Sequence, residues 1–159
     1  MSESPDRIIE INLDENSIKA WSPDVDHERK VAIFDLLEQN FFQPVGERFA
    51  GPYIVNLAVI ENRLYFEIMS ADRDVQGHII LALSPFRKIV REYFQVCETY
   101  FTAIKTASPS RIEAIDMGRR GLHNQGSELL VERLKDKINV DHDTARRLFT
   151  LICVLHIRA

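Results

Sequence analysis

The sequence predicts an α+β fold, in which an antiparallel sheet of three or four strands packs against a long helix and a C-terminal cluster of helices follows. Two observations predict this order. Residues 52–83 contain β-forming segments separated by short turns. Residues 84–159 instead have apolar residues at helical spacing, with Ser-Pro pairs where helices begin.

The N-terminal part predicts one strand and one helix. Apolar and polar residues alternate over 9–13, which is typical of a short strand. Ser22-Pro23 then provides a helix cap followed by proline at the first helical position. We expect this helix to end near Asn40. Its predicted buried stripe consists of Val25, Val31, Phe34 and Leu37.

The middle of the chain predicts a β-meander. Residues 52–60 and 64–69 are rich in β-forming residues and are separated by a three-residue turn, which indicates a hairpin. A turn over 72–77 leads to a third strand over 78–83. These connections are too short for crossovers, so we expect antiparallel pairing. The side chains expected to face the core are Leu57, Val59, Phe66, Leu81 and Leu83.

The last part predicts helices. Ser84-Pro85 begins a long helix that extends to about Thr106, and Ser108-Pro109 begins another. Asp141 is the expected cap of the last helix. The length of 159 residues fits one domain. Within it we expect a disordered tail over 1–6, the sheet and first helix over 7–83, and the helical part over 84–159.

The charge is unevenly distributed. The chain carries a net charge of −4, which argues against nucleic acid as a partner and does not favour an anionic membrane. Residues 105–159, however, contain 10 basic and 7 acidic residues. We therefore expect an acidic protein partner or a small anionic ligand at the basic C-terminal helices. The candidate surface there includes Arg111, Arg119, Arg120, Arg146 and Arg147.

Two cysteines, Cys97 and Cys153, each lie within an apolar run. Isolated apolar cysteines are typical of core residues in a reducing compartment. No Cys or His pair has the spacing of metal ligands, and the N-terminus has no apolar signal segment. The sequence therefore predicts a cytoplasmic protein with no metal and no cofactor.

Residues 117–128 (MGRRGLHNQGSE) are the main candidate for a functional segment. Paired arginines suit the recognition of phosphate or carboxylate, and glycine permits close approach of a ligand. The predicted anion-binding residues are Arg119, Arg120, Asn124 and Ser127, with His123 as the candidate catalytic residue. A helix start at Gly126 would add backbone N–H donors. The alternative, which we prefer, is a kinked junction whose polar side chains are structural.

A second polar cluster contains Asp24, Asp26, His27 and Glu28. Asp24 and Glu28 are four residues apart and share a helix face, which is one requirement of a metal site. Acidic residues are also favoured in the first turn of a helix by the helix dipole. We prefer this second interpretation because no further ligand cluster is evident.

The segment 148–157 (LFTLICVLHI) is apolar on nearly all sides. Such a helix is usually buried, either at the centre of its own domain or in a homodimer interface. The dimer alternative would use Leu148, Leu151 and Leu155. We prefer the central helix, because a single domain needs one such element to complete its core.

No motif in the chain defines an activity, so its function stays unknown at this level. The absence of a catalytic set favours a small binding or regulatory module. The alternative is an enzyme acting on a small phosphorylated or carboxylated substrate. In that enzyme Arg119 and Arg120 would bind the anion, and His123 would act as general acid or base.

Five segments carry a resemblance to a known family. They are PDVDHERKVAIFDLLEQN (23–40), GPYIVNLAVIENRLYFEI (51–68), LSPFRKIVREYF (83–94), GRRGLHNQGSELLVERL (118–134) and DTARRLFTLICVLH (143–156). Through them the chain resembles an uncharacterised protein family of alphaproteobacteria. The resemblance implies a small cytoplasmic bacterial protein and brings no activity to transfer.

Overall fold

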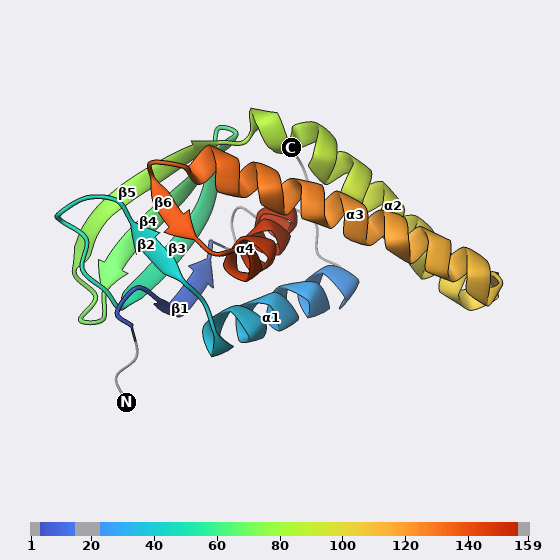
Figure 1. The fold of residues 1–159 in the computed structure, drawn as a ribbon, viewed down its shortest axis with the longest axis horizontal. Coiled ribbons are helices and arrows are strands. Elements are labelled where there is room, and N and C mark those ends of the chain that lie inside the picture. Colours follow the sequence, from blue (N-terminus) through green and yellow to red (C-terminus); the bar gives the residue numbers. More distant parts are fainter. Residues whose placement is uncertain (1–3, 15–22, 156–159) are drawn as a thin grey trace.

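A four-stranded sheet lies at one end of the molecule, with the helices beside it (Figure 1). The computed structural model describes residues 4–14 and 23–155, except for the side chains of residues 23–25. The sheet has the strand order β1-β3-β4-β5. The helical part extends away from it through two long antiparallel helices (Figure 1). The α+β class is therefore confirmed.

The meander predicted in the middle of the chain is present. It consists of β3 (Tyr53–Ile60), β4 (Arg63–Ser70) and β5 (Val75–Ala82), all paired antiparallel. The edge strand β1 (Ile8–Leu13) pairs in parallel with β3, so the sheet is mixed. An α-helix connects these two strands, and that connection is long enough for the crossover that parallel pairing requires.

A second, smaller sheet is absent from the sequence-based prediction. It pairs β2 (Phe42–Pro44) antiparallel with β6 (Ile138–Val140). Each strand has only three residues, which is too short for an alternating pattern to be recognised. This sheet joins the segment that follows the first helix to the segment that precedes the last helix.

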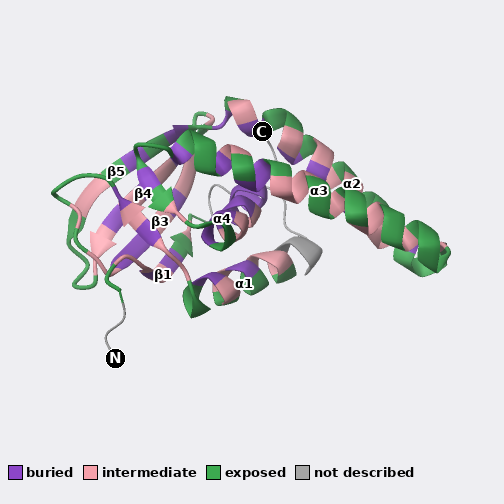
Figure 2. Ribbon diagram, in the orientation of Figure 1, coloured by how far each residue is buried: buried purple, intermediate pink, exposed green. Residues whose placement is uncertain are grey.

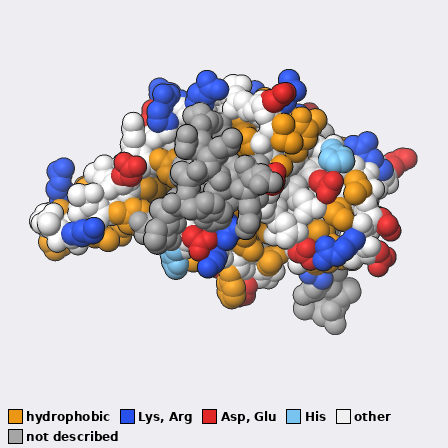
Figure 3. Space-filling model, turned by 180° about the vertical axis from the view of Figure 1, so that it is seen from behind, with side chains coloured by type: hydrophobic (Ala, Val, Ile, Leu, Met, Phe, Trp, Pro, Cys, Tyr) orange, Lys and Arg blue, Asp and Glu red, His pale blue; other side chains and the backbone are white. Residues whose placement is uncertain are grey.

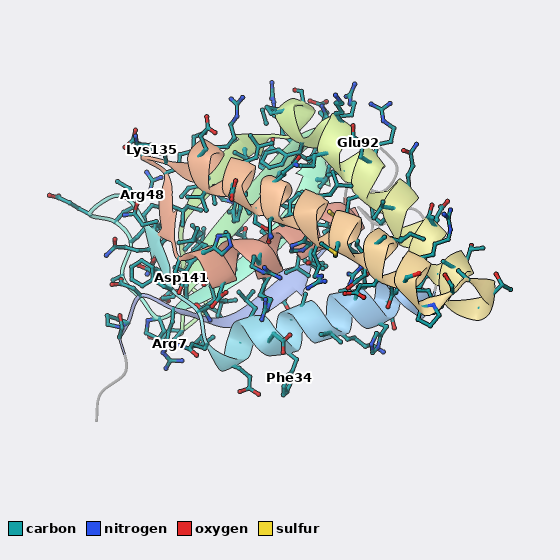
Figure 4. The ribbon with its side chains drawn as sticks, turned by 45° about the vertical axis from the view of Figure 1, so that its right-hand side comes forward. Arg7, Phe34, Arg48, Glu92, Lys135 and Asp141 are labelled. Carbon is teal, nitrogen blue, oxygen red and sulfur yellow. The ribbon has the colours of Figure 1, made fainter. Side chains whose placement is uncertain are left out.

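Helix α1 (Pro23–Glu38) has the predicted extent but a different buried face. The predicted stripe is wrong for its described side chains, because Val31, Phe34 and Leu37 are 44%, 60% and 37% exposed. Ala32 and Leu36 face the core instead. Phe34 points outward in Figure 4, and Figure 3 shows hydrophobic side chains at the lower edge, in the region of α1. The other two residues involved, Ser22 and the side chain of Val25, lie outside the described part.

Helices α2 (Arg87–Thr106) and α3 (Pro109–Leu134) run side by side (Figure 1). A 3₁₀ turn over Ser84–Phe86 precedes α2, and Ser84 makes no side-chain cap. The other two predicted caps are present. The Ser108 hydroxyl accepts from the Arg111 backbone N–H, and the Asp141 carboxylate accepts from that of Thr144.

Helix α3 is continuous over 26 residues, so neither the kinked junction nor the helix start at Gly126 exists. Tertiary packing on α2 and α4 outweighs the low helix propensity of three glycines. Gly126 is buried against the ring of Phe149, where any Cβ would collide. Gly118 and Gly121 have open space beside them.

Helix α4 (His142–Leu155) is the central helix of the molecule, between α3 and α1 (Figures 1 and 2). Its apolar side chains from Leu148 onward are buried, as are Cys97 and Cys153. The homodimer contact through Leu148, Leu151 and Leu155 is therefore contradicted, since all three side chains are inside the core.

The N-terminal segment is ordered earlier than the sequence predicts. The Asp6 carbonyl accepts from the Phe42 backbone N–H, and the Gln43 amide donates to the Asp6 carboxylate. The tail expected over 1–6 thus contributes Asp6 to the packing of β2.

Replacing the three glycines of α3 by alanine should change the stability of the fold in different directions, depending on the position. Gly118→Ala and Gly121→Ala should each raise the free energy of unfolding by up to about 1 kcal/mol, because alanine is the better helix former. Gly126→Ala should lower it by about 1–3 kcal/mol, because the rigid, buried Phe149 ring has to move. Urea unfolding of the three single variants measures the difference. Stabilisation by Gly126→Ala would contradict the close α3–α4 contact.

Candidate functional site

A cleft of about 360 Å³ opens between α1, α3 and α4, with one side chain from α2. This volume lies in the usual range for small-molecule sites. Four arginines, two carboxylates and two histidines surround it. The lining residues are His27, Glu28, Val31, Ala32, Asp35, Tyr93, Arg119, Arg120, His123, Arg146, Arg147 and Thr150.

The same spacing recurs on all three helices. The lining side chains stand at positions i, i+1 and i+4, which bring one face of an α-helix towards a common point. They are 27, 28 and 31 on α1, where 31, 32 and 35 repeat the spacing, 119, 120 and 123 on α3, and 146, 147 and 150 on α4. Because α4 packs against both α1 and α3, these faces meet at the cleft.

The two arginines from α3 share one carboxylate. Arg119 donates to Asp116 Oδ1 through Nε and Nη2, at 3.0 and 2.6 Å, and its guanidinium lies over the Tyr100 ring. Arg120 Nε lies 3.2 Å from Asp116 Oδ2. Two positive charges therefore share one negative charge, and the pair keeps a net positive charge at the cleft.

The two arginines from α4 are balanced less completely. Arg146 Nη1 donates to the amide oxygen of Asn124 at 3.0 Å, and among the described residues no carboxylate forms an ion pair with it. Arg147 Nε lies 3.7 Å from Asp35 Oδ2, a long contact. Arg146 is thus positioned by a neutral group, and no carboxylate of the described residues offsets its charge.

His123 is held between two aromatic rings. Its ring meets those of Tyr93 and Phe149 edge-on, with centroids 5.5 and 5.2 Å away. Its Nε2 lies 2.8 Å from Thr150 Oγ1, and the Thr150 hydroxyl donates to the Arg146 carbonyl. Since that hydroxyl has one proton, Nε2 must be the donor to Thr150. Nδ1 is then a buried acceptor with no partner among the described residues.

The pKa of His123 is lowered to about 4, first by burial and then by the charges of Arg146, Arg119 and Arg147, with His142 last. The imidazole is therefore neutral at pH 7. A neutral imidazole has no second proton to give, and one with so low a pKa is a weak base. His123 is suited to accept a hydrogen bond and to position Thr150.

The structure brings together Arg119, Arg120 and His123 from the predicted set. Asn124 lies behind the cleft and orients Arg146. Ser127 is buried in the middle of α3 and donates to the His123 carbonyl, so the backbone donors expected beside it are used within the helix. The segment 117–128 thus supplies one wall of the cleft.

The acidic cluster in α1 separates in the structure. The Asp26 carboxylate pairs with Arg29 and Lys30, while His27 and Glu28 line the cleft. The side chain of Asp24 lies outside the described part. Over residues 4–14 and 23–155, no group of three His, Cys, Asp or Glu side chains has a metal-binding arrangement.

Several lining residues were not singled out from the sequence, namely Asp35, Tyr93 and Thr150. Asp35 and Thr150 have only the i, i+1, i+4 spacing as a local signal, which is common in any helix, and Tyr93 is the single lining residue from α2. Burial, then Glu28, raises the pKa of the Tyr93 hydroxyl, which therefore stays protonated.

Within the described ranges, no helix is both long and apolar enough to cross a membrane.

The fold and the cleft define an α+β protein with an arginine-lined cleft among its helices. The chain belongs to the uncharacterised protein family UPF0262, whose sequence profile matches residues 5–158. A UPF0262 protein of Brucella canis is 58% identical over 152 residues, covering 96% of this chain and 94% of the relative. One from Brucella anthropi is 58% identical over 153 residues, with the same coverage.

These matches confirm the resemblance identified from the five sequence segments. No solved structure gives a significant match. Because the family description states no activity, membership adds none to this chain.

The depressed pKa of His123 predicts a pH dependence of stability. Its folded pKa of about 4 lies below the ordinary value of 6.5, so between these values the unfolded chain binds the proton more tightly. The stabilisation is fully present above about pH 6.5 and is lost as the pH falls towards 4. Between pH 7 and pH 5 the free energy of unfolding should fall by about 2 kcal/mol from this group.

Urea unfolding of the wild type and of His123→Gln at the two pH values measures this contribution. The wild type should lose about 2 kcal/mol more than His123→Gln. His78→Gln, which removes an exposed histidine from β5, should follow the wild type. Equal losses in the wild type and His123→Gln would show that His123 is not desolvated as described.

Proposed function

We propose that this chain is a small single-domain binding module, whose cleft holds a phosphate- or carboxylate-bearing small molecule. The observation that carries the proposal is the convergence of four arginines on one cleft. Arg146 in particular is oriented by the neutral Asn124. Guanidinium groups bind such anions through paired N–H donors, which makes them suited to this role.

Electrostatics supports a ligand rather than a purely structural role. The positive charges around the cleft lower the pKa of His123, so their field reaches the inner end of the cleft. An anion bound there would offset that field and gain from weak screening by solvent. The cleft is also of small-molecule size, which favours a small ligand over an acidic protein partner.

The enzyme alternative is less well supported. It needs His123 as general acid or base, but a pKa of about 4 leaves the imidazole neutral and weakly basic at pH 7. The buried Nδ1 is better suited to accept a hydrogen bond than to exchange protons with a substrate. We therefore assign the cleft a binding role.

A cytoplasmic location is part of the proposal. Cys97 and Cys153 are buried free thiols, and burial raises the pKa of both, to about 11 for Cys97. Thiols of this kind are typical of proteins in a reducing compartment.

Arg146→Ala should weaken anion binding by about tenfold to a hundredfold, the range expected for losing a charged hydrogen-bonding group. Isothermal titration calorimetry with inorganic phosphate, pyrophosphate and malonate at fixed ionic strength provides the measurement. Arg146→Lys should bind with intermediate affinity, because it keeps the charge and loses the planar fork.

The matched control is Arg111→Ala, which removes an exposed arginine from α3 in a different groove. It should leave the affinity unchanged. If Arg111→Ala and Arg146→Ala weaken binding equally, the attraction comes from overall charge and the cleft is not the site. If none of the three anions binds the wild type, the proposal is wrong.

A further inference from the structure

The two walls of the cleft carry charges of opposite sign. Helices α3 and α4 supply its four arginines, whereas α1 supplies both of its carboxylates, Glu28 and Asp35. The Asp35 carboxylate is 42% exposed, and the one ion pair that it forms among the described residues is the long contact with Arg147. A ligand that is anionic throughout would therefore bring negative charge against the α1 wall.

The carboxylate of Glu28 acts on Tyr93, which lines the cleft, and on two buried thiols outside it. It contributes to the raised pKa values of Tyr93, Cys97 and Cys153, after burial in each case. Glu28 and Asp35 thus place negative charge on the α1 side of the cleft, where a cation would be favoured, opposite the arginines that favour an anion.

The cleft is too large for one anionic group. Its volume of about 360 Å³ corresponds to about twelve water molecules at about 30 Å³ each. A phosphate at Arg146 leaves space that extends to α1. The α1 wall also carries the apolar side chains of Val31 and Ala32, between Glu28 and Asp35 in the sequence, which suit contact with an aliphatic segment.

We propose that the ligand is a zwitterion, in which a short aliphatic segment joins an anionic group held by the arginines to an ammonium group facing Glu28 and Asp35. This inference rests on the proposed anion-binding function and narrows its ligand class. It predicts an order of affinity opposite to that of a simple arginine site. Such a site would prefer the ligand with more negative charge, whereas this cleft prefers the ligand with the added ammonium.

The test compares matched pairs of ligands by calorimetry at pH 7. Phosphoethanolamine, 3-aminopropyl phosphate and 4-aminobutyl phosphate are measured against ethyl, propyl and butyl phosphate. At least one amine should bind about tenfold more tightly than the alkyl phosphate of equal length. If every alkyl phosphate binds as tightly as its amine or more tightly, the zwitterion is excluded while anion binding stands. If neither series binds, anion binding itself fails.

Variants locate the source of the preference. Glu28→Gln combined with Asp35→Asn should abolish the preference for the amine and leave the affinity for the alkyl phosphate equal or higher. Glu38→Gln removes an exposed carboxylate from the same helix outside the cleft and should keep the preference. Retention of the preference in the double variant would overturn the assignment to α1. If the double variant does not fold, Asp35→Asn alone should reduce the preference at least threefold.

Discussion

The contact between Gly126 and the ring of Phe149 is the constraint on which the rest of the helical part depends. Only a residue without a side chain allows α3 to approach α4 closely enough for this ring to fit. The same ring meets His123 and Tyr93 edge-on, so one buried side chain links α2, α3 and α4. The position of the imidazole in the cleft follows directly from that packing.

Electrostatics in the cleft follows from the same arrangement. Close packing removes water from His123, and the arginines of α3 and α4 then act on it at short range, so its pKa falls and the ring stays neutral. Keeping His123 uncharged avoids a further positive charge beside the guanidinium groups. The Nε2 proton is committed to Thr150, which leaves Nδ1 as an acceptor within an otherwise cationic wall.

The sequence predicted elements better than their assembly. The meander, the helices and the cap at Asp141 were predictable because periodicity and capping are local properties. The parallel pairing of β1 with β3 joins Asn12 to Asn56, and no local pattern specifies such a distant partner. The face of α1 was mispredicted because it carries more apolar residues than one buried stripe can hold. Three residues that line the cleft, Arg119, Arg120 and His123, could be selected from the composition of the segment 117–128. Their position opposite α1 could not be predicted, because it depends on the fold.

The α1 wall shows why tertiary contacts were needed to define the cleft. The C-terminal end of α1 is anchored by Asn40, whose side chain bonds both backbone groups of Ile8 in β1, 32 residues away. The next residue, Phe41, donates its backbone N–H to the Thr144 hydroxyl in α4, 103 residues away. These bonds hold α1 against β1 and α4, and thereby set Asp35 opposite Arg147. The opposite charges of the cleft thus belong to segments that only the fold brings together.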